Sequence, residues 1–266
     1  MINSPWGPLP SWMGYFAAIV LGSSLGSFAN VLIYRLPREE SLIRPPSRCP
    51  SCERPIKPWE NIPILSWFML GGRCKGCHQR ISWRYPAVEA ASALLAVVAV
   101  KIFGFSYAGI AYGLLFIALL SLIIIDIEHW LLPFAITIPI AIIGFAGSLF
   151  YGMRPVADSL LGMITGFALF MGLLLGGKAL FKRDAMGGGD VVFGIMAGSF
   201  LGWKLTIFMV FAASFLGTLT ALPLLMLGKD VGGRAIPFGP YLAVAMVISL
   251  FAGESVIRWY IGLIGG

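Results

Sequence analysis

Long apolar segments recur along this chain, and they constrain its fold more than any other feature. Several windows reach the roughly 20 apolar residues that an α-helix needs to cross a bilayer. Only 12% of the residues are charged, whereas ordinary soluble domains carry about 25%. The sequence therefore predicts an all-α polytopic membrane protein. The first window, near Trp12, lacks the basic start and cleavage site of a signal peptide, so we expect it to be a retained span.

About eight transmembrane helices are expected from these windows and the polar breaks between them. Their approximate ranges are 12–34, 86–103, 107–125, 131–151, 157–181, 190–203, 205–227 and 237–253. The last residues are too few to span a membrane, and we expect them in the interface. The predicted parts are an N-terminal helix (1–34), a loop domain (35–85), a seven-helix domain (86–253) and a C-terminal tail (254–266).

Basic residues gather in one loop, which indicates how the chain is oriented. Residues 35–85 hold ten Lys/Arg and four Glu, so +6 of the net charge of +7 lies there. Basic charge beside a span marks the cytoplasmic side, so the charge points to topology and not to a nucleic-acid partner. If this loop is cytoplasmic, 15 of the 19 Lys/Arg lie on that side. The same orientation brings Asp126 and Asp190 to one face of the membrane.

All four cysteines lie in the 35–85 loop as two C-x-x-C pairs. Cys49 and Cys52 are separated from Cys74 and Cys77 by 21 residues, close to the spacing of a four-thiolate zinc site. We expect a structural zinc ion, because four protein ligands leave no open position for water. A disulfide or redox pair is the alternative, which a reducing compartment disfavours. A second alternative is that His78 replaces Cys77 as the fourth metal ligand.

Two aspartates are the candidate catalytic residues. Asp190 follows three glycines, which would let a substrate backbone approach it closely. Asp126 ends the apolar run before Leu132-Pro133. Two carboxyls that share a site can hydrolyse an amide, because one activates water while the other keeps a proton. Taken alone, each acid also fits a helix cap or a solvated residue. Helix dipoles favour the anion at Asp190, which begins a helix, over Asp126, which ends one.

Several stretches together resemble the bacterial prepilin peptidases, which are bifunctional type IV leader peptidases and N-methyltransferases. They run in the order of that family from residue 26 to about residue 241. The stretches are 26–37 (GSFANVLIYRLP), the two C-x-x-C pairs, 61–67 (NIPILSW), 84–89 (RYPAVE), Asp126 with Leu132-Pro133, 187–190 (GGGD) and 236–241 (IPFGPY).

The resemblance implies that Asp126 and Asp190 are the catalytic pair of a G-x-G-D-type aspartic protease. It implies substrates with a short basic leader, type IV prepilins or type II secretion pseudopilins, cut after Gly at the cytoplasmic face of the bacterial inner membrane. It also implies that S-adenosylmethionine then methylates the new N-terminus. No residue binding that cofactor is identified, because the loop lacks a Rossmann pattern. Candidates for contact with the leader are Glu39, Glu40, Glu53 and Glu60.

Two other classes of protein remain open from the residues alone. A proton- or cation-coupled transporter would also use paired carboxylates in a membrane, although it predicts them near the midplane, with broken helices related by a repeat. A non-catalytic membrane anchor would explain the cysteines but not the glycine-rich acid loop. The number of copies that assemble is not indicated by the sequence.

Overall fold

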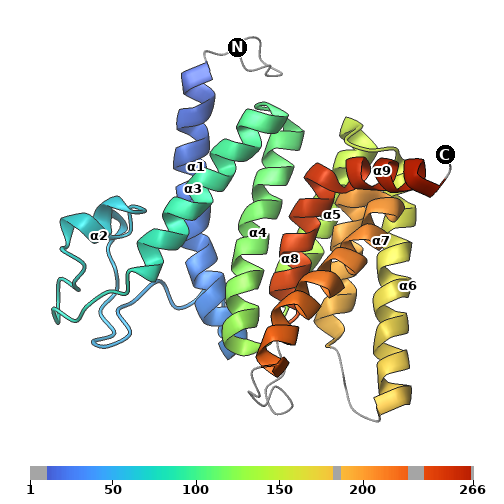
Figure 1. The fold of residues 1–266 in the computed structure, drawn as a ribbon. Helices are drawn as coiled ribbons and strands as arrows, with labels where there is room; N and C mark the ends of the chain where they lie inside the picture. The colour runs from blue at the N-terminus through green and yellow to red at the C-terminus, as the bar shows by residue number, and fades with distance from the viewer. Residues whose placement is uncertain (1–10, 182–186, 227–236, 265–266) are drawn as a thin grey trace. The chain divides into compact units, whose positions relative to one another are not determined.

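The computed structural model describes residues 11–181, 187–226 and 237–264 (Figure 1). Apart from two isolated bridges, the regular structure in these residues is helical. Within them, seven helices are long and apolar enough to cross a membrane. The predicted all-α membrane fold is therefore confirmed. Chain contacts divide the molecule into two compact units, residues 1–121 and 122–266.

The N-terminal unit is built on two long helices that pack closely. They are α1 (Ser11–Arg35) and α3 (Arg84–Phe103). A Cβ atom on Gly26 would lie 2.7 Å from Cα of Glu89, and one on Gly22 would lie 2.9 Å from Cα of Ala93. Glycine at both positions therefore lets the two backbones meet, as the spacing of these residues predicts.

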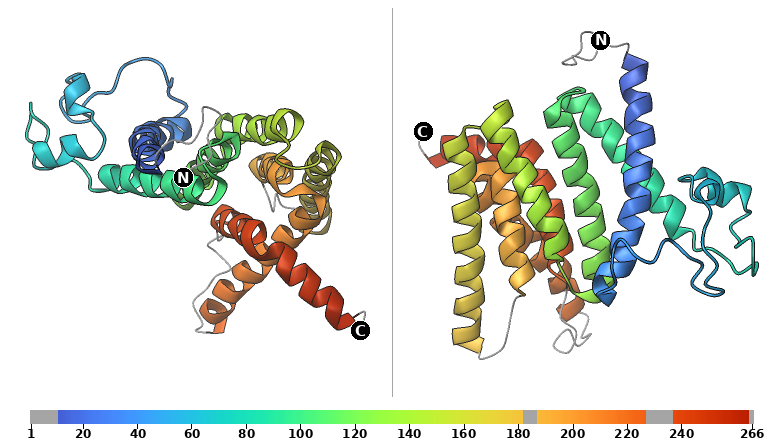
Figure 2. Two further views of the ribbon diagram at one scale, coloured as in Figure 1. Left: turned by 90° about the horizontal axis from the view of Figure 1, so that it is seen from above. Right: turned by 180° about the vertical axis from the view of Figure 1, so that it is seen from behind.

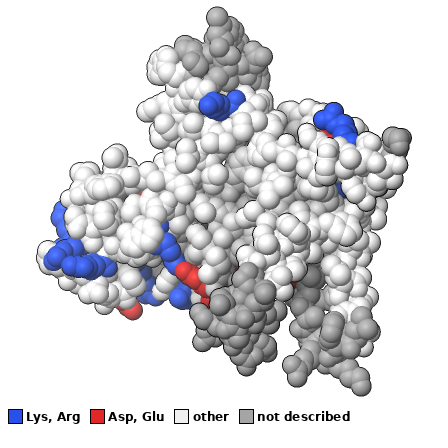
Figure 3. All heavy atoms as spheres, in the orientation of Figure 1, with Lys and Arg blue, Asp and Glu red and all other residues white. Residues whose placement is uncertain are grey.

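A short-element module, residues 36–83, connects α1 to α3. It contains η1 (Leu36–Arg38), η2 (Pro58–Glu60) and α2 (Leu65–Met69). Figure 3 shows Lys and Arg concentrated over this module and little charge elsewhere on the visible face. The helix α4 (Tyr107–His129) then follows α3 and continues into the second unit.

The C-terminal unit consists of the end of α4 and the helices that follow it (Figures 1 and 2). These elements are α5 (Phe134–Tyr151), α6 (Val156–Phe181), α7 (Gly188–Met226), α8 (Gly239–Ile248), the π-helical turn η3 (Ser249–Gly253) and α9 (Glu254–Ile264). The links expected after the spans 157–181 and 205–227 fall partly or wholly outside the described residues.

The helix α7 contains both of the spans expected at 190–203 and 205–227, because the break between them is a single residue. Gly202 has non-helical dihedral angles, φ 72° and ψ 175°, which suit glycine. Arg154 Nε donates a hydrogen bond to the carbonyl of Phe200 (3.1 Å), and Thr206 Oγ1 donates one to the carbonyl of Gly202 (2.7 Å). Both ends of α7 lie at the same end of the unit as the start of α8 (Figure 1). The chain therefore reverses at Gly202.

Glycines also set the packing of α6 against the first half of α7. Gly162 lies against the backbone of Gly198, and Gly166 lies against the backbone of Gly194. The four-residue spacing of glycines after Asp190 predicts such close packing. The contact fixes the direction of the first half of α7, and therefore the position of its N-terminus, relative to α6.

The tail forms a helix, α9, that leaves α8 at an angle after the π-helical turn (Figures 1 and 2). Its large apolar side chains are mostly exposed, with Trp259 65% and Leu263 63% exposed. The expectation that this tail lies in the membrane interface stays a prediction.

Candidate functional site

Asp126 lies in the last turn of α4, slightly before the link where the sequence places it. The backbone N–H of Trp130 donates to the carbonyl of Asp126 (3.0 Å), and Trp130 then adopts a positive φ of 59° that turns the chain away. The side chain of Asp126 is buried, with 6% of the residue exposed. Burial of an acid needs polar partners, so its hydrogen bonds decide what it can do.

The partner of Asp126 is the N-terminus of α8. The backbone N–H of Gly239 donates to Oδ2 of Asp126 at 2.8 Å. The first N–H groups of a helix have no partner within the helix, and its dipole favours an anion there. The dipole argument from the sequence, which favoured the anion only at Asp190, therefore no longer separates the two acids.

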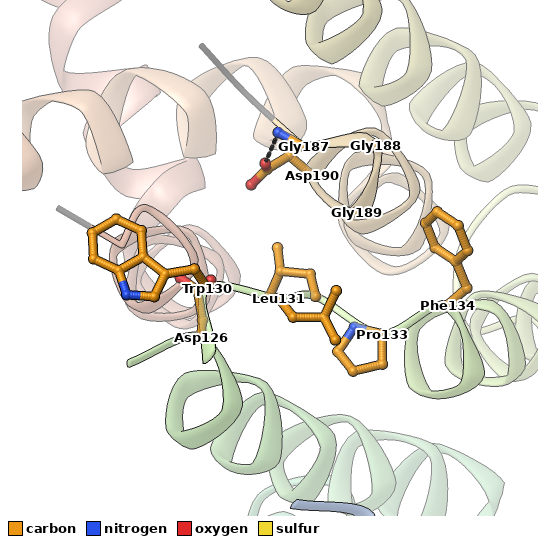
Figure 4. Close-up of a pocket in the computed structure, with 10 residues that line it drawn as sticks. Asp126, Trp130, Leu131, Pro133, Phe134, Gly187, Gly188, Gly189 and Asp190 are labelled. Atoms are coloured by element: carbon orange, nitrogen blue, oxygen red, sulfur yellow. Dashed lines mark hydrogen bonds between the residues drawn. The ribbon is translucent and has the colours of Figure 1, made fainter. Parts of the chain in front are cut away.

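Asp190 lies in the first turn of α7, beyond the glycine that precedes the helix. Its backbone N–H donates to the carbonyl of Gly187 (3.2 Å), while the N–H of Gly187 donates to Oδ2 of Asp190 (3.2 Å). In a capping box, an acidic side chain in the first turn accepts a hydrogen bond from the backbone N–H of the N-cap residue, and Asp190 makes this bond with Gly187. Figure 4 shows the second oxygen of Asp190 turned away from this bond, so one oxygen holds the loop and the other faces the pocket.

The glycine loop fits against the segment that follows Asp126. A Cβ atom on Gly189 would lie 2.7 Å from the carbonyl oxygen of Leu132, whereas one on Gly188 would meet nothing closer than 3.8 Å, at Phe134. The Leu-Pro segment and the glycine loop therefore touch through backbone at Gly189. This contact brings the C-terminal end of α4 close to the N-terminal end of α7.

The two aspartates line one pocket of the C-terminal unit (Figure 4). Its other walls are apolar side chains and the backbone of the glycine loop. Among the described residues of this lining, Asp126 and Asp190 are the groups able to accept or donate a proton at ordinary pH. The lining consists of Asp126, Trp130, Leu131, Leu132, Pro133, Phe134, Gly187, Gly188, Gly189 and Asp190.

Sequence reasoning identified both acids but not the group that holds one of them. Gly239 belongs to the 236–241 stretch, to which the sequence assigned no role. A Cβ atom there would lie 2.6 Å from Oδ2 of Asp126, so glycine is required beside the carboxylate. The sequence signal was a glycine between two prolines at the start of an apolar segment.

The four cysteines form two turns of the same shape. In the first, the N–H of Cys49 donates to the carbonyl of Arg54 (3.0 Å); in the second, the N–H of Cys74 donates to that of Gln79 (2.9 Å). The residue after each pair has a positive φ, 54° at Glu53 and 57° at His78. Two matching C-x-x-C turns facing each other are typical of a structural zinc site.

The sulfur positions fit one tetrahedral ion. All four Sγ atoms lie within 4.8 Å of one another, with Cys49 to Cys77 at 3.8 Å and Cys52 to Cys74 at 4.0 Å. Four Zn–S bonds of about 2.3 Å place the sulfurs about 3.8 Å apart. Hydrogen bonds from the backbone N–H groups of Cys77 and Gly76 lower the pKa of the Cys74 thiol to about 6. A thiolate is the form that binds metal.

A partly buried ion pair supports the cysteine turns. Arg54 donates to Glu60 Oε2 (2.9 Å), and the backbone N–H of Lys57 donates to the same oxygen (3.2 Å). The Lys57 N–H, partly offset by burial and assisted by Arg54, holds the pKa of Glu60 below its ordinary value. Glu60 is thus a structural residue of the module, which counts against its expected contact with a leader peptide.

Other acids of the described residues have partners outside the pocket. His129 Nε2 lies 3.9 Å from Glu128 Oε2, and Asp158 pairs with Arg154 at 2.7 Å beside Gly202. Asp158 thereby stabilises the break in α7. Asp184 and Asp230 lie outside the described residues.

Comparison with known proteins gives a consistent result over nearly the whole chain. The family model described as "Bacterial Peptidase A24 N-terminal domain" matches residues 20–103, and the one described as "Type IV leader peptidase family" matches residues 113–222. No solved structure matches the chain. The transporter alternative finds no support in these matches.

Curated relatives carry one name, "Prepilin leader peptidase/N-methyltransferase". The protein of Aeromonas salmonicida is 35% identical, over 95% of this chain and 96% of its own length. That of Pseudomonas aeruginosa is 33% identical over 93% of each chain. That of Myxococcus xanthus is 38% identical over 85% of this chain and 68% of its own length.

Proposed function

The chain belongs to the type IV leader peptidase family, and we propose that Asp126 and Asp190 are the catalytic carboxyls of its peptidase. The protein is a prepilin leader peptidase with N-methyltransferase activity. The observation that carries the residue assignment is the pocket that the two aspartates share, which holds no other proton-transfer side chain among its described lining residues.

The hydrolysis follows from two carboxyls, one ionised and one protonated. The ionised carboxylate takes a proton from water, whose oxygen attacks the scissile carbonyl carbon. The protonated carboxyl gives its proton to the carbonyl oxygen. Collapse of the tetrahedral intermediate then breaks the C–N bond. The amine leaves with the proton that the first carboxylate had taken, and the second carboxylate recovers its proton from a hydroxyl of the intermediate. The Gly239 N–H holds Oδ2 of Asp126 in place, and the Gly187 N–H holds Oδ2 of Asp190.

The walls of the pocket suit the substrate class. Trp130, Leu131 and Phe134 supply an apolar surface beside the acids, as expected for the hydrophobic segment that follows the cut in a prepilin or pseudopilin. The glycine loop leaves room for a peptide backbone at Gly187, which lines the pocket and where a Cβ atom would meet nothing closer than 3.8 Å. A basic leader ending in Gly would then lie outside the apolar part.

The orientation that we propose puts the pocket and the cysteine module on the cytoplasmic side of the bacterial inner membrane. Support comes from the division of basic residues, 15 against four, under the predicted topology. The family's substrates carry their leader on that side. The division into residues 1–34, 35–85, 86–253 and 254–266 is proposed with it.

We propose that the metal of the cysteine site is zinc and that its role is structural. Cys49, Cys52, Cys74 and Cys77 would hold it, and it would cross-link a module with little core of its own. S-adenosylmethionine is the proposed methyl donor, on the methyltransferase name of the relatives. This chain's residues around that donor are not assigned.

Incubation of the purified full-length protein with a prepilin-like peptide tests this function. With S-adenosylmethionine present, mass spectrometry should show loss of the leader after Gly and a methyl group on the new N-terminus. A pseudopilin-like peptide tests the second substrate class. An intact peptide under conditions where the protein is folded would contradict the proposal.

A further inference from the structure

The cysteine module exposes an apolar surface that its own fold does not cover. Leu65, Phe68 and Met69 of α2 are 61%, 67% and 80% exposed. Their spacing, i, i+3 and i+4, puts them on one face of the helix. Trp59 and Ile62 extend this surface, with exposures of 59% and 44%. We refer to these five residues as the α2 surface.

The opposite side of α2 is fixed to the module. Ser66 is buried, and Trp67 Nε1 donates to the carbonyl of Ile81 (3.2 Å). Since one face of α2 is bonded inward, the exposed face cannot turn to cover itself. A solvent-exposed apolar surface of this kind marks a contact with a partner or a membrane.

One hydrogen bond sets the height of α2 beside a membrane span. The buried carboxylate of Glu89 accepts the N–H of Ile64, the residue before α2, at 2.6 Å. Glu89 lies five residues into the candidate span that begins at Arg84. With a rise of about 1.5 Å per residue, that is about 7.5 Å along the helix axis from the first residue of α3. Interfacial helices bury their apolar face about 5–10 Å into the headgroup and acyl boundary.

The turn at Ile64 is held in a conformation that β-branched residues avoid. Ile64 has φ 63° and ψ −55°, and the N–H of Leu65 donates to the carbonyl of Pro63 (2.6 Å). This is a strained γ-turn, which persists only where surrounding contacts enforce it. The bond to Glu89 is such a contact, and it directs the start of α2.

The arrangement in space agrees with this height. Figures 1 and 2 show α2 beside the first turns of α3. Figure 3 shows Lys and Arg on the lower and outer parts of the module, while the upper part, over α2, is uncharged. Lys57 Nζ lies 5.2 Å from the centre of the Trp59 ring, so a basic group borders the α2 surface.

We propose that the α2 surface is inserted in the lipid bilayer, at the boundary between headgroups and acyl chains, on the side where α1 ends and α3 begins. The module is tethered to membrane helices at both ends, so the bilayer is always within reach. Its basic residues attract anionic headgroups, and an aromatic residue at the edge is typical of this depth. A prepilin helix or a second copy of the chain would require neither the basic border nor this height.

Site-specific photocross-linking of the full-length protein tests this contact. Phe68 is replaced by benzoylphenylalanine, and the protein is placed in nanodiscs of phosphatidylethanolamine and phosphatidylglycerol. A matched variant carries the probe at Glu53, whose side chain is 74% exposed in the first cysteine turn. After illumination, the intact mass should show a lipid adduct at position 68 several-fold more abundant than at position 53.

Three results would overturn the proposal: equal lipid adducts at the two positions, a cross-link to a second copy, or a cross-link that moves to an added prepilin peptide. A measurement without the probe guards against misfolding of the variants. Phospholipids brominated on the upper acyl chain should quench fluorescence in the unmodified protein more than in Trp59→Phe. The emission of Trp59, taken as the difference between the two proteins, should fall with the brominated lipids, and a Trp59 emission that they leave unchanged would also contradict insertion.

Discussion

Gly239 donates its backbone N–H to Oδ2 of Asp126 at 2.8 Å, although the two residues are 113 positions apart in the chain. The bond makes the N-terminus of α8 part of the site that α4 and α7 form. Three segments therefore position the two acids: the end of α4 with its Leu-Pro link, the glycine loop before α7, and the first residue of α8.

Gly239→Ala should impair cleavage without unfolding the protein. The new Cβ would lie 2.6 Å from Oδ2 of Asp126 and 2.9 Å from its Cγ, so the carboxylate must move. Displacement of a reacting group by about 1 Å can lower a rate about 100-fold. The measurement is the rate of leader cleavage. Gly172→Ala is the control, because its Cβ meets nothing within 4 Å, and it should cleave at the wild-type rate.

Alanine at Gly188 and alanine at Gly189, the two residues directly before Asp190, should change the cleavage rate to very different extents. Gly189→Ala places a methyl group 2.7 Å from the Leu132 carbonyl oxygen, a backbone atom that cannot rotate away. Gly188→Ala finds its nearest neighbour at 3.8 Å. We expect the first variant to lose most of its cleavage rate and the second to keep most of it. Similar rates for both would show that the contact with Leu132 does not position the loop.

Removal of the metal should unfold the cysteine module. Cys49→Ser and Cys74→Ser each take one ligand from the proposed tetrahedral site, and metal analysis should fall from about one zinc per chain to well below one. Amide exchange in residues 47–57 should then accelerate, because metal binding supplies folding free energy. Full metal content in either variant would argue against the four-thiolate site. Ser51→Ala, between the first two cysteines, serves as the control.

Glu60→Gln should lower the thermal stability of the module at neutral pH. The folded-state pKa of Glu60 is held below its ordinary value, so its ionised form stabilises the fold above the unfolded pKa of about 4.3. That contribution disappears as the pH falls through the lower folded pKa. Melting curves of the two proteins should therefore differ at pH 7 and converge in acid. Glu53→Gln, at an exposed pair, should change little at either pH.

The membrane fold could be predicted from sequence because each helix carries its own signal. Apolar length gave the spans, and the glycine spacings at Gly22 and Gly26 predicted close packing that the structure confirms. The sequence predicted a boundary between two helices at residues 203–205, whereas the structure has it at Gly202. It proves to be a single-residue break within α7, since Arg154, Ser159 and Thr206 satisfy the freed backbone groups.

The contacts of the site were harder to foresee, because backbone groups make them. The donor to Asp126 is the N–H of Gly239, and the neighbour of Gly189 is a carbonyl oxygen, so no side-chain pattern announces either contact. Glu89 shows the same limit. It lies near the start of α3, where an acid ordinarily interacts with the helix dipole, yet in the structure it holds the turn before α2.

Cleavage rates of Asp126→Asn, Asp190→Asn and the double variant test the central claim most directly. Each protein would be purified at full length, checked for an unchanged melting transition, and incubated with the same prepilin-like peptide. The catalytic pair predicts a loss of about 100-fold or more for each single variant. The double variant should be little worse than either, because residues that act as a unit are not additive. A double variant that removes the leader at the wild-type rate would contradict the account.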